Sequence, residues 1–171
     1  GGMNQRVLIA MSLLCNPTVI IADEPTTALD VVMQDKILQE IINLKEKLEV
    51  AMIVITHDIS VVAEICDKIA IMYGGKIVES GETRSIFKNS CHPYTIGLLQ
   101  SFPSILGRLG KLLSIPGAPP SLLNPTPGCR FRPRCPRSQE ICAKDPPLTE
   151  FSEDHFSLCH FALDPDSVSY T

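Results

Sequence analysis

Three features are scarce or missing in this sequence of 171 residues: long apolar runs, an excess of positive charge and internal repeats. No apolar run approaches the ~18 residues that a membrane-spanning helix needs. The net charge of −4 gives no reason to expect nucleic-acid binding over the whole surface. The apolar fraction of 44% allows an ordinary core. Length and composition therefore predict one globular domain, or slightly more than one.

Proline and cysteine are unevenly distributed along the chain. Of the 14 prolines, 12 lie at or beyond Pro93, and four of the seven cysteines fall within 31 residues near the carboxyl end. This change of composition predicts a first domain over residues 1–102, a Pro- and Cys-rich extension over 103–163 and a short tail over 164–171.

Residues 3–56 alternate between helical and strand patterns. Apolar residues recur at helical spacing in 3–15 and again in 30–48. Between and after these segments, 19–22 and 50–56 are short apolar runs typical of strands. The β-branched run over 19–22 predicts a strand that is buried on both faces. A strand, a helix and a strand at this spacing predict a βαβ unit with parallel strands.

The pattern continues with a hairpin and three short helices. Residues 69–73 and 76–79 flank Gly74-Gly75, which is a strong hairpin signal. Helical periodicity is weaker in the remaining segments, which are predicted as helices over 60–66, 83–88 and 94–100.

Polar side chains follow both strands of the predicted βαβ unit. Asp23 and Glu24 come after the first strand, and His57 comes after the second. Ligands bind beyond the carboxyl ends of parallel strands. A single acid at a strand end is more often a capping or solvated group. Polar side chains at the ends of both strands favour a ligand site. A carboxylate can hold Mg²⁺ through water, the next can orient an attacking water, and a histidine can bind a phosphoryl oxygen.

Four motifs in this region resemble those of ATP-binding-cassette ATPases. ADEP resembles the Walker B motif with its catalytic glutamate, TALD the D-loop and ITHD the switch-histidine loop. GGMNQR resembles the signature LSGGxxQR without its first two residues. All four occur in the family's order and at its spacing. The resemblance implies an α/β fold of the P-loop NTPase type, with a parallel sheet and helices, of which this chain holds a part.

The resemblance also implies a role for individual residues. Asp23 would support Mg²⁺, Glu24 would polarise the attacking water and His57 would sense the γ-phosphate of ATP. Asp30, which is also a plausible N-cap for the helix that follows it, would cross a dimer interface. The signature residues implied to contact ATP held by the partner subunit are Gly1, Gly2 and Gln5.

Parts of such an ATPase are missing from the sequence. There is no GxxxxGK[ST] phosphate loop. The adenine-stacking aromatic residue and the Q-loop glutamine, which lie upstream of the signature in the family, are missing too. The sequence therefore resembles the second half of a nucleotide-binding domain, truncated at its amino end. We expect that the isolated chain neither binds ATP tightly nor hydrolyses it.

Residues 91–160 narrow the resemblance within the family. CHPYTIGLLQSFP and IPGAPPSLLNPTPGCRFRPRCP resemble the carboxyl-terminal extension of ATPase subunits from oligopeptide and dipeptide importers, to which nickel importers are related. The implied function is an ATPase subunit that energises peptide import from the cytoplasmic face of the membrane. The implied partners are a second, identical or different ATPase subunit, two transmembrane permease subunits and, indirectly, a peptide-binding protein, without nucleic acid.

The extension carries four cysteines at the spacing C-x5-C-x6-C-x16-C: Cys129, Cys135, Cys142 and Cys159. Disulfides are unfavourable in a cytosolic ATPase, and the short knuckles of structural zinc sites are missing. A [4Fe–4S] cluster has looser spacing rules. Cluster, zinc and no metal all stay open, and the resemblance favours the cluster. His155 and His160 are alternative ligands, although we expect both at the surface.

Two other functions stay open. The chain could be a non-catalytic interaction module that binds an iron–sulfur cluster or zinc through residues 103–160. It could also come from a soluble cassette ATPase of translation or DNA repair, although such a protein would not need this extension. Iron and sulfide analysis tests the first alternative, and co-purification with membrane subunits tests the second.

Overall fold

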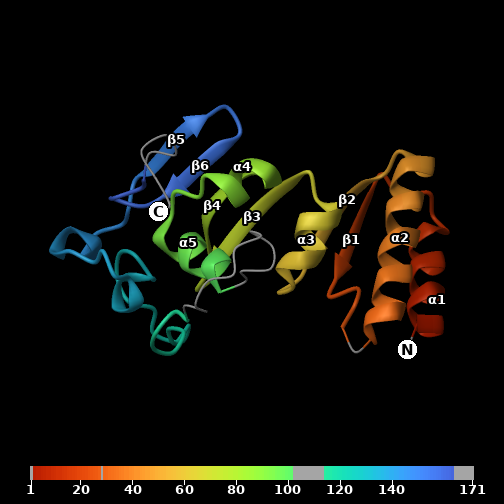
Figure 1. Cartoon of the computed structure of the whole chain (residues 1–171), viewed down its shortest axis with the longest axis horizontal. Helices are drawn as coiled ribbons and strands as arrows, with labels where there is room; N and C mark the ends of the chain where they lie inside the picture. Colours follow the sequence, from red (N-terminus) through yellow and green to blue (C-terminus); the bar gives the residue numbers. More distant parts are fainter. Residues whose placement is uncertain (1, 28, 102–113, 164–171) are drawn as a thin grey trace. The chain divides into compact units, whose positions relative to one another are not determined.

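The computed structural model describes three stretches of the chain, residues 2–27, 29–101 and 114–163. The chain divides into two compact units, residues 1–66 and residues 67–171 (Figure 1). The predicted boundary between residues 102 and 103 and the predicted tail lie outside the described residues. That boundary therefore stays a prediction.

The first unit contains the predicted βαβ arrangement with a further helix at each end. Its elements are α1 (Gly2–Leu13), β1 (Val19–Asp23), α2 (Val31–Leu48), β2 (Ala51–Ile55) and α3 (Ile59–Ile65). Strands β1 and β2 pair in parallel, with Asp23 beside Ile55. Asp30 caps α2, because its carboxylate accepts the backbone N–H of Met33 at 2.9 Å. The predicted α/β class and the predicted N-cap are confirmed.

The two faces of the β1–β2 sheet differ in how well they are covered. On one face, Ile20 lies with Leu8 of α1 and Ile41 of α2 around an apolar cavity of about 190 Å³. On the other face, Ile21 is 65% exposed and Ile53 is 53% exposed. The prediction that the strand over 19–22 is buried on both faces is wrong within the described unit, because no described element of this unit covers Val19 and Ile21.

Helix α1 leaves its apolar side chains in solvent as well. Met3 is 79% exposed and Leu14, just beyond the helix, is 78% exposed. The contacts of α1 with α2 include the ion pair of Arg6 with Glu40, whose closest atoms are 2.7 Å apart. The helix forms where its periodicity predicts, but its apolar stripe is only partly covered.

The second unit is built on a four-stranded antiparallel sheet in the order β3-β4-β6-β5. Its strands are β3 (Lys68–Tyr73), β4 (Lys76–Glu82), β5 (Leu148–Ser152) and β6 (His155–Leu158), and its helices are α4 (Thr83–Lys88), α5 (Pro93–Gln100) and the 3-10 turns Arg132–Arg134 and Glu140–Ala143. Gly74 and Gly75 have φ angles of 57° and 78°, as a tight hairpin turn requires. The β3–β4 hairpin is confirmed, whereas the β5–β6 hairpin was not predicted.

The core of the second unit joins the hairpin to residues far along the chain. Phe131 is 2% exposed and contacts the ring of Tyr73, with 5.2 Å between ring centroids. Arg134 ties a further loop to this core, since its guanidinium donates to the carbonyl of Ile115 and to the Tyr73 hydroxyl. Residues of the predicted extension thus share one core with β3 and β4.

No helix in the described stretches is long and apolar enough to cross a membrane.

Candidate functional site

Glu24 and His57 follow two different strands and meet beyond the edge of the β1–β2 sheet. The Nδ1 atom of His57 lies 2.8 Å from Oε1 of Glu24. The hydroxyl of Thr27 donates to the other carboxylate oxygen, also at 2.8 Å. The side chains of His57 and Glu24 are 81% and 36% exposed, so both can be reached from solvent. The structure therefore brings together the two residues predicted to be catalytic.

The backbone of Glu24 is in an unusual conformation. Its φ angle is 49°, in the left-handed region that costs a non-glycine residue about 1–2 kcal/mol. The backbone N–H of Glu24 donates to the carbonyl of Ile55 at 2.8 Å, which ties the start of this loop to the end of β2. Local strain of this kind is concentrated at functional sites, where surrounding contacts hold it in place.

Glu24 and His57 each shift the pKa of the other. The pKa of Glu24 is lowered because His57, and then Thr27, donate hydrogen bonds to the carboxylate. The pKa of His57 is raised because the Glu24 carboxylate accepts its hydrogen bond and attracts its positive charge. The carboxylate therefore stays ionised at neutral pH. An ionised acceptor beside an imidazole donor can orient a water and bind a phosphoryl oxygen.

The other predicted residues of this site occupy separate places in the first unit. Asp23 ends β1, one residue before Glu24, and Asp30 uses its carboxylate to cap α2. Gly2 begins α1 and is buried, and Gln5 lies one turn later beside the apolar cavity. Gly1 is outside the described residues.

Three neighbours of this site were not singled out from the sequence: Thr27, Gln34 and Asp58. Gln34 donates to Asp58 at 3.1 Å, and Asp58 caps α3 by accepting the N–H of Ser60. Burial raises the pKa of Asp58, but hydrogen bonds from Ser60 and Gln34 outweigh it and the net pKa is lowered. Thr27 and Asp58 lie inside the TALD and ITHD motifs, so motif position was the available signal.

The four predicted cysteines converge in the second unit. They line one small cavity of about 10 Å³ together with His92, Pro93, Phe131, Arg132, Arg137, His160 and Phe161. All four thiols are free of disulfides. The four cysteines, which are spread along the chain, therefore meet at one place in the fold.

The environment of three of these thiols raises their pKa. Burial raises the pKa of Cys129 and Cys135, and hydrogen bonds from nearby backbone groups oppose this only in part. The N–H of Phe161 donates to the sulfur of Cys159 at 3.4 Å. Burial, with the charges of the neighbouring cysteines, raises the pKa of Cys159 to about 11. These three thiols therefore stay protonated at neutral pH.

The two histidines considered as alternative ligands differ from each other in burial, since His155 is buried and His160 is partly exposed. His155 is 4% exposed and lies 3.0 Å from the Glu79 carboxylate, so its expected surface position is wrong. The reason is that the unpredicted strand β6 carries it into the unit. His160 lines the cysteine cavity, and its Nε2 lies 3.2 Å from the carbonyl oxygen of Lys144.

Known proteins are similar to this chain over most of its length. The family described as "Oligopeptide/dipeptide transporter, C-terminal region" matches residues 78–142. The "Oligopeptide transport ATP-binding protein OppD" of Salmonella typhimurium is 50% identical over 159 residues, which cover 93% of this chain and 48% of that protein. The "Dipeptide transport ATP-binding protein DppD" of Caldanaerobacter subterraneus is 54% identical over 147 residues, covering 86% and 45%.

A solved structure also matches in part. It is described as a dimeric post-hydrolysis state of an ATP-binding cassette bound to ADP and Pi, is 37% identical, and covers 48% of this chain and 35% of that one, with a TM-score of 0.44. The present chain spans about half the length of the curated relatives it matches.

Proposed function

We propose that this chain, which carries the carboxyl-terminal region of oligopeptide/dipeptide transporters over residues 78–142, is part of an ATP-hydrolysing subunit that energises peptide import. The named relatives are oligopeptide and dipeptide transport ATP-binding proteins. The observation that carries the proposal is the Glu24–His57 pair, held at 2.8 Å beyond two parallel strands. Such a pair suits phosphoryl transfer, which depends on positioning and electrostatics.

Each residue of the site then has a task. Glu24 orients the attacking water, and His57 donates a hydrogen bond to a transferring phosphoryl oxygen. Asp23 offers carboxylate oxygens, the ligands that Mg²⁺ prefers. Bound Mg²⁺ would neutralise charge on the phosphate oxygens. Gly1, Gly2 and Gln5 are proposed to face ATP held by a second subunit, because a helix start offers N–H groups to an anion. Asp30 is proposed to cross the interface with that subunit.

The open face of the β1–β2 sheet supports a subunit that is completed by further structure. Parallel sheets are normally covered on both faces, whereas Ile21 and Ile53 are more than half exposed. The relatives are about twice as long as this chain. We infer that a half-domain with the phosphate loop packs against this face.

The partners follow from the same proposal. They are a second ATPase subunit, two transmembrane permease subunits and, indirectly, a peptide-binding protein, with the chain at the cytoplasmic face of the membrane. Residues 1–102 would belong to the nucleotide-binding domain and 103–163 to the extension, followed by the tail.

We also propose that the four cysteines hold a [4Fe–4S] cluster, with a single zinc ion as the alternative. Among the described residues, no three of the four sulfurs lie mutually within 4.8 Å. A tetrahedral zinc site brings its sulfurs to about 3.8 Å. The absence of such a three-sulfur group from the described residues favours the cluster over zinc, and all four cysteines line one cavity of about 10 Å³.

The ATPase proposal is tested by joining this chain to the amino-terminal half of the Salmonella relative. Steady-state ATP turnover is then measured for the chimera and for two variants. Glu24→Gln should lower turnover about 10²–10⁴-fold, since a positioned base typically contributes that much. Glu46→Gln, at an exposed position on α2, is the matched control and should leave turnover unchanged. Retained turnover in Glu24→Gln would remove Glu24 from its role.

The cluster proposal is tested by iron and acid-labile sulfide analysis of the chain purified without oxygen. About four irons and four sulfides per chain are expected. Cys142→Ala should lose both, and Cys15→Ala, which changes an exposed cysteine, should keep both. Zinc in place of iron, or neither metal, would contradict the cluster.

A further inference from the structure

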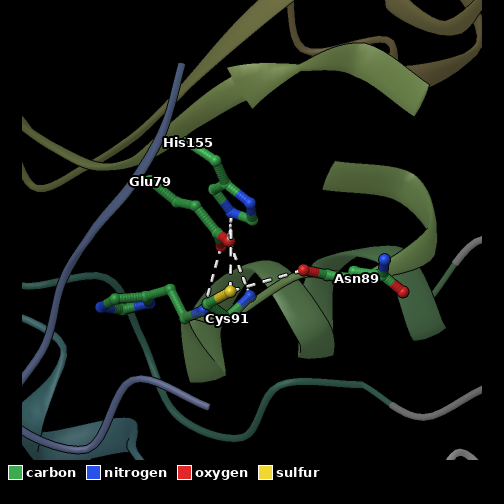
Figure 2. A network of polar contacts seen from close by, with 5 residues as sticks. Glu79, Asn89, Cys91 and His155 are labelled. Atoms are coloured by element: carbon green, nitrogen blue, oxygen red, sulfur yellow. Dashed lines mark hydrogen bonds and ion pairs between the residues drawn. The ribbon is translucent and has the colours of Figure 1, made fainter. Parts of the chain in front are cut away.

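A different set of metal-binding side chains is buried in the second unit. Glu79 of β4, Cys91 just before α5 and His155 of β6 bring their ligand atoms within 4.8 Å of one another (Figure 2). Their exposed fractions are 0%, 0% and 4%. The three residues come from segments far apart in the sequence. None of them belongs to the four-cysteine site or to the Glu24–His57 pair.

The distances within this set match those between the ligands of a tetrahedral ion. His155 Nε2 lies 3.0 Å from Glu79 Oε1 and 3.5 Å from Cys91 Sγ. Zinc bonds of about 2.0 Å to nitrogen and oxygen and about 2.3 Å to sulfur place these pairs at about 3.3 Å and about 3.5 Å. The side chains are therefore already close to the arrangement that one ion requires.

Glu79, Cys91 and His155 are hydrogen-bonded to one another and to nearby backbone groups. A single ring nitrogen, His155 Nε2, faces both the carboxylate and the thiol, and one proton on it makes one linear bond. The Glu79 carboxylate is oriented by the N–H groups of Cys91, at 2.6 Å, and His92, at 3.0 Å. The Cys91 thiol donates to the carbonyl of Asn89 at 3.4 Å (Figure 2). A cation between the three atoms would replace that bond and give the nitrogen, the thiolate and one carboxylate oxygen a common partner, with the backbone N–H donors holding the carboxylate in place.

A fourth oxygen is available on the same side of the sheet. Ser157 is the register partner of Glu79, so the two side chains lie on one face of the β4–β6 pair. Ser157 is fully buried, and its hydroxyl has no hydrogen-bond partner. A buried hydroxyl without a hydrogen-bond partner is unfavourable, and an ion at this place would offer it one.

We propose that Glu79, Cys91 and His155 bind one Zn²⁺ ion, with the Ser157 hydroxyl beside the fourth position. A mixed nitrogen, sulfur and oxygen set is typical of zinc. The ion links β4, the segment before α5 and β6, so it fixes the β5–β6 hairpin to the rest of the unit. This site does not depend on ATP hydrolysis or on the metal held by the four cysteines.

The test is the zinc content and zinc affinity of the whole chain, measured by metal analysis after equilibration in zinc buffers. Cys91→Ser keeps the size of the side chain but removes the thiolate. It should lose one zinc per chain, or bind that zinc at least about tenfold more weakly. His155→Gln should do the same. Cys15→Ala, which changes an exposed cysteine, should change nothing.

The four-cysteine site is controlled separately by Cys142→Ala. That variant should lose the metal of the four cysteines and keep the zinc bound at Glu79, Cys91 and His155. Circular dichroism identifies any variant that fails to fold, and Cys91→Ser and His155→Gln provide two independent chances of a folded one. Equal zinc content and affinity in the wild type and in either folded variant would overturn the proposal.

Discussion

The two units of this chain differ in how much of their own apolar surface they cover. In the second unit, Phe131 and Ile86 are 2% and 0% exposed inside one core. In the first unit, Ile21 and Ile53 stand more than half exposed on an open sheet face. The second unit therefore closes its own core, whereas the first positions Glu24 and His57 on a sheet that is covered on one side only.

Phe131→Ala should have the largest effect on stability, because it disrupts the closed core of the second unit. It removes a fully buried ring from the core of the second unit, and truncations of this kind cost about 3–5 kcal/mol of unfolding free energy. Urea denaturation of the whole chain measures the loss. Leu123→Ala, at a side chain that is 92% exposed, is the control and should stay within about 0.5 kcal/mol. A loss below 1 kcal/mol for Phe131→Ala would mean that this core is not closed.

Ile21→Ala tests whether added structure covers the open face of the β1–β2 sheet, because its effect on stability depends on that cover. In the isolated chain the exposed side chain should cost less than about 0.5 kcal/mol. In the chimera with the amino-terminal half of the Salmonella relative, a buried Ile21 should cost about 2–5 kcal/mol. Equal small effects in both proteins would show that this face is not where the added half packs.

Asp30→Ala should have a smaller effect within the first unit. The Asp30 carboxylate caps α2 through the N–H of Met33, and losing such a cap costs about 1 kcal/mol. Hydrogen exchange of the α2 amides in the isolated chain measures this cost locally. Asp35→Ala, inside the same helix, is the comparison and should leave the exchange of the first turn unchanged.

The pH dependence of the Glu24–His57 pair gives the smallest effect. The folded pKa of His57 lies above its ordinary value of 6.5, so its contribution to stability is complete below pH 6.5 and lost as pH rises through the folded pKa. The folded pKa of Glu24 lies below 4.5, so its contribution is present above pH 4.5 and lost as pH falls through the folded pKa. The pair therefore stabilises the fold most between pH 4.5 and 6.5.

A nuclear magnetic resonance titration of the His57 ring checks this directly. The midpoint should lie above 6.5 in the wild type and should fall toward 6.5 in Glu24→Gln. Glu46→Gln, at an exposed position on α2, is the control variant and should leave the His57 midpoint unchanged. An unchanged His57 midpoint would mean that the pair does not form in solution.

Local sequence signals account for much of the fold and of the first site. The Gly74-Gly75 turn, the Asp30 cap and the βαβ order are encoded by neighbouring residues, and the structure contains all three. The meeting of Glu24 and His57 follows from the parallel pairing of β1 with β2, which places both strand ends at one edge.

Features that depend on residues far apart in the chain could not be predicted from local sequence signals. Strand β6 is short and pairs with β4 through Glu79 and Ser157, which are 78 positions apart, so the burial of His155 has no local signal. The exposure of Ile21 likewise depends on what covers the sheet rather than on the β-branched run itself. Periodicity predicts that a face is apolar, but it does not identify the segment that covers it.

We propose that this chain supplies the water-orienting carboxylate and the histidine of an ATPase site, while a second half supplies the phosphate loop. Equilibrium dialysis with MgATP, applied to the isolated chain and to the chimera with the amino-terminal half of the Salmonella relative, tests this most directly. We predict ATP binding by the chimera and no tight binding by the chain alone. A micromolar dissociation constant for the isolated chain would show that tight ATP binding does not need the second half, and would contradict this proposal.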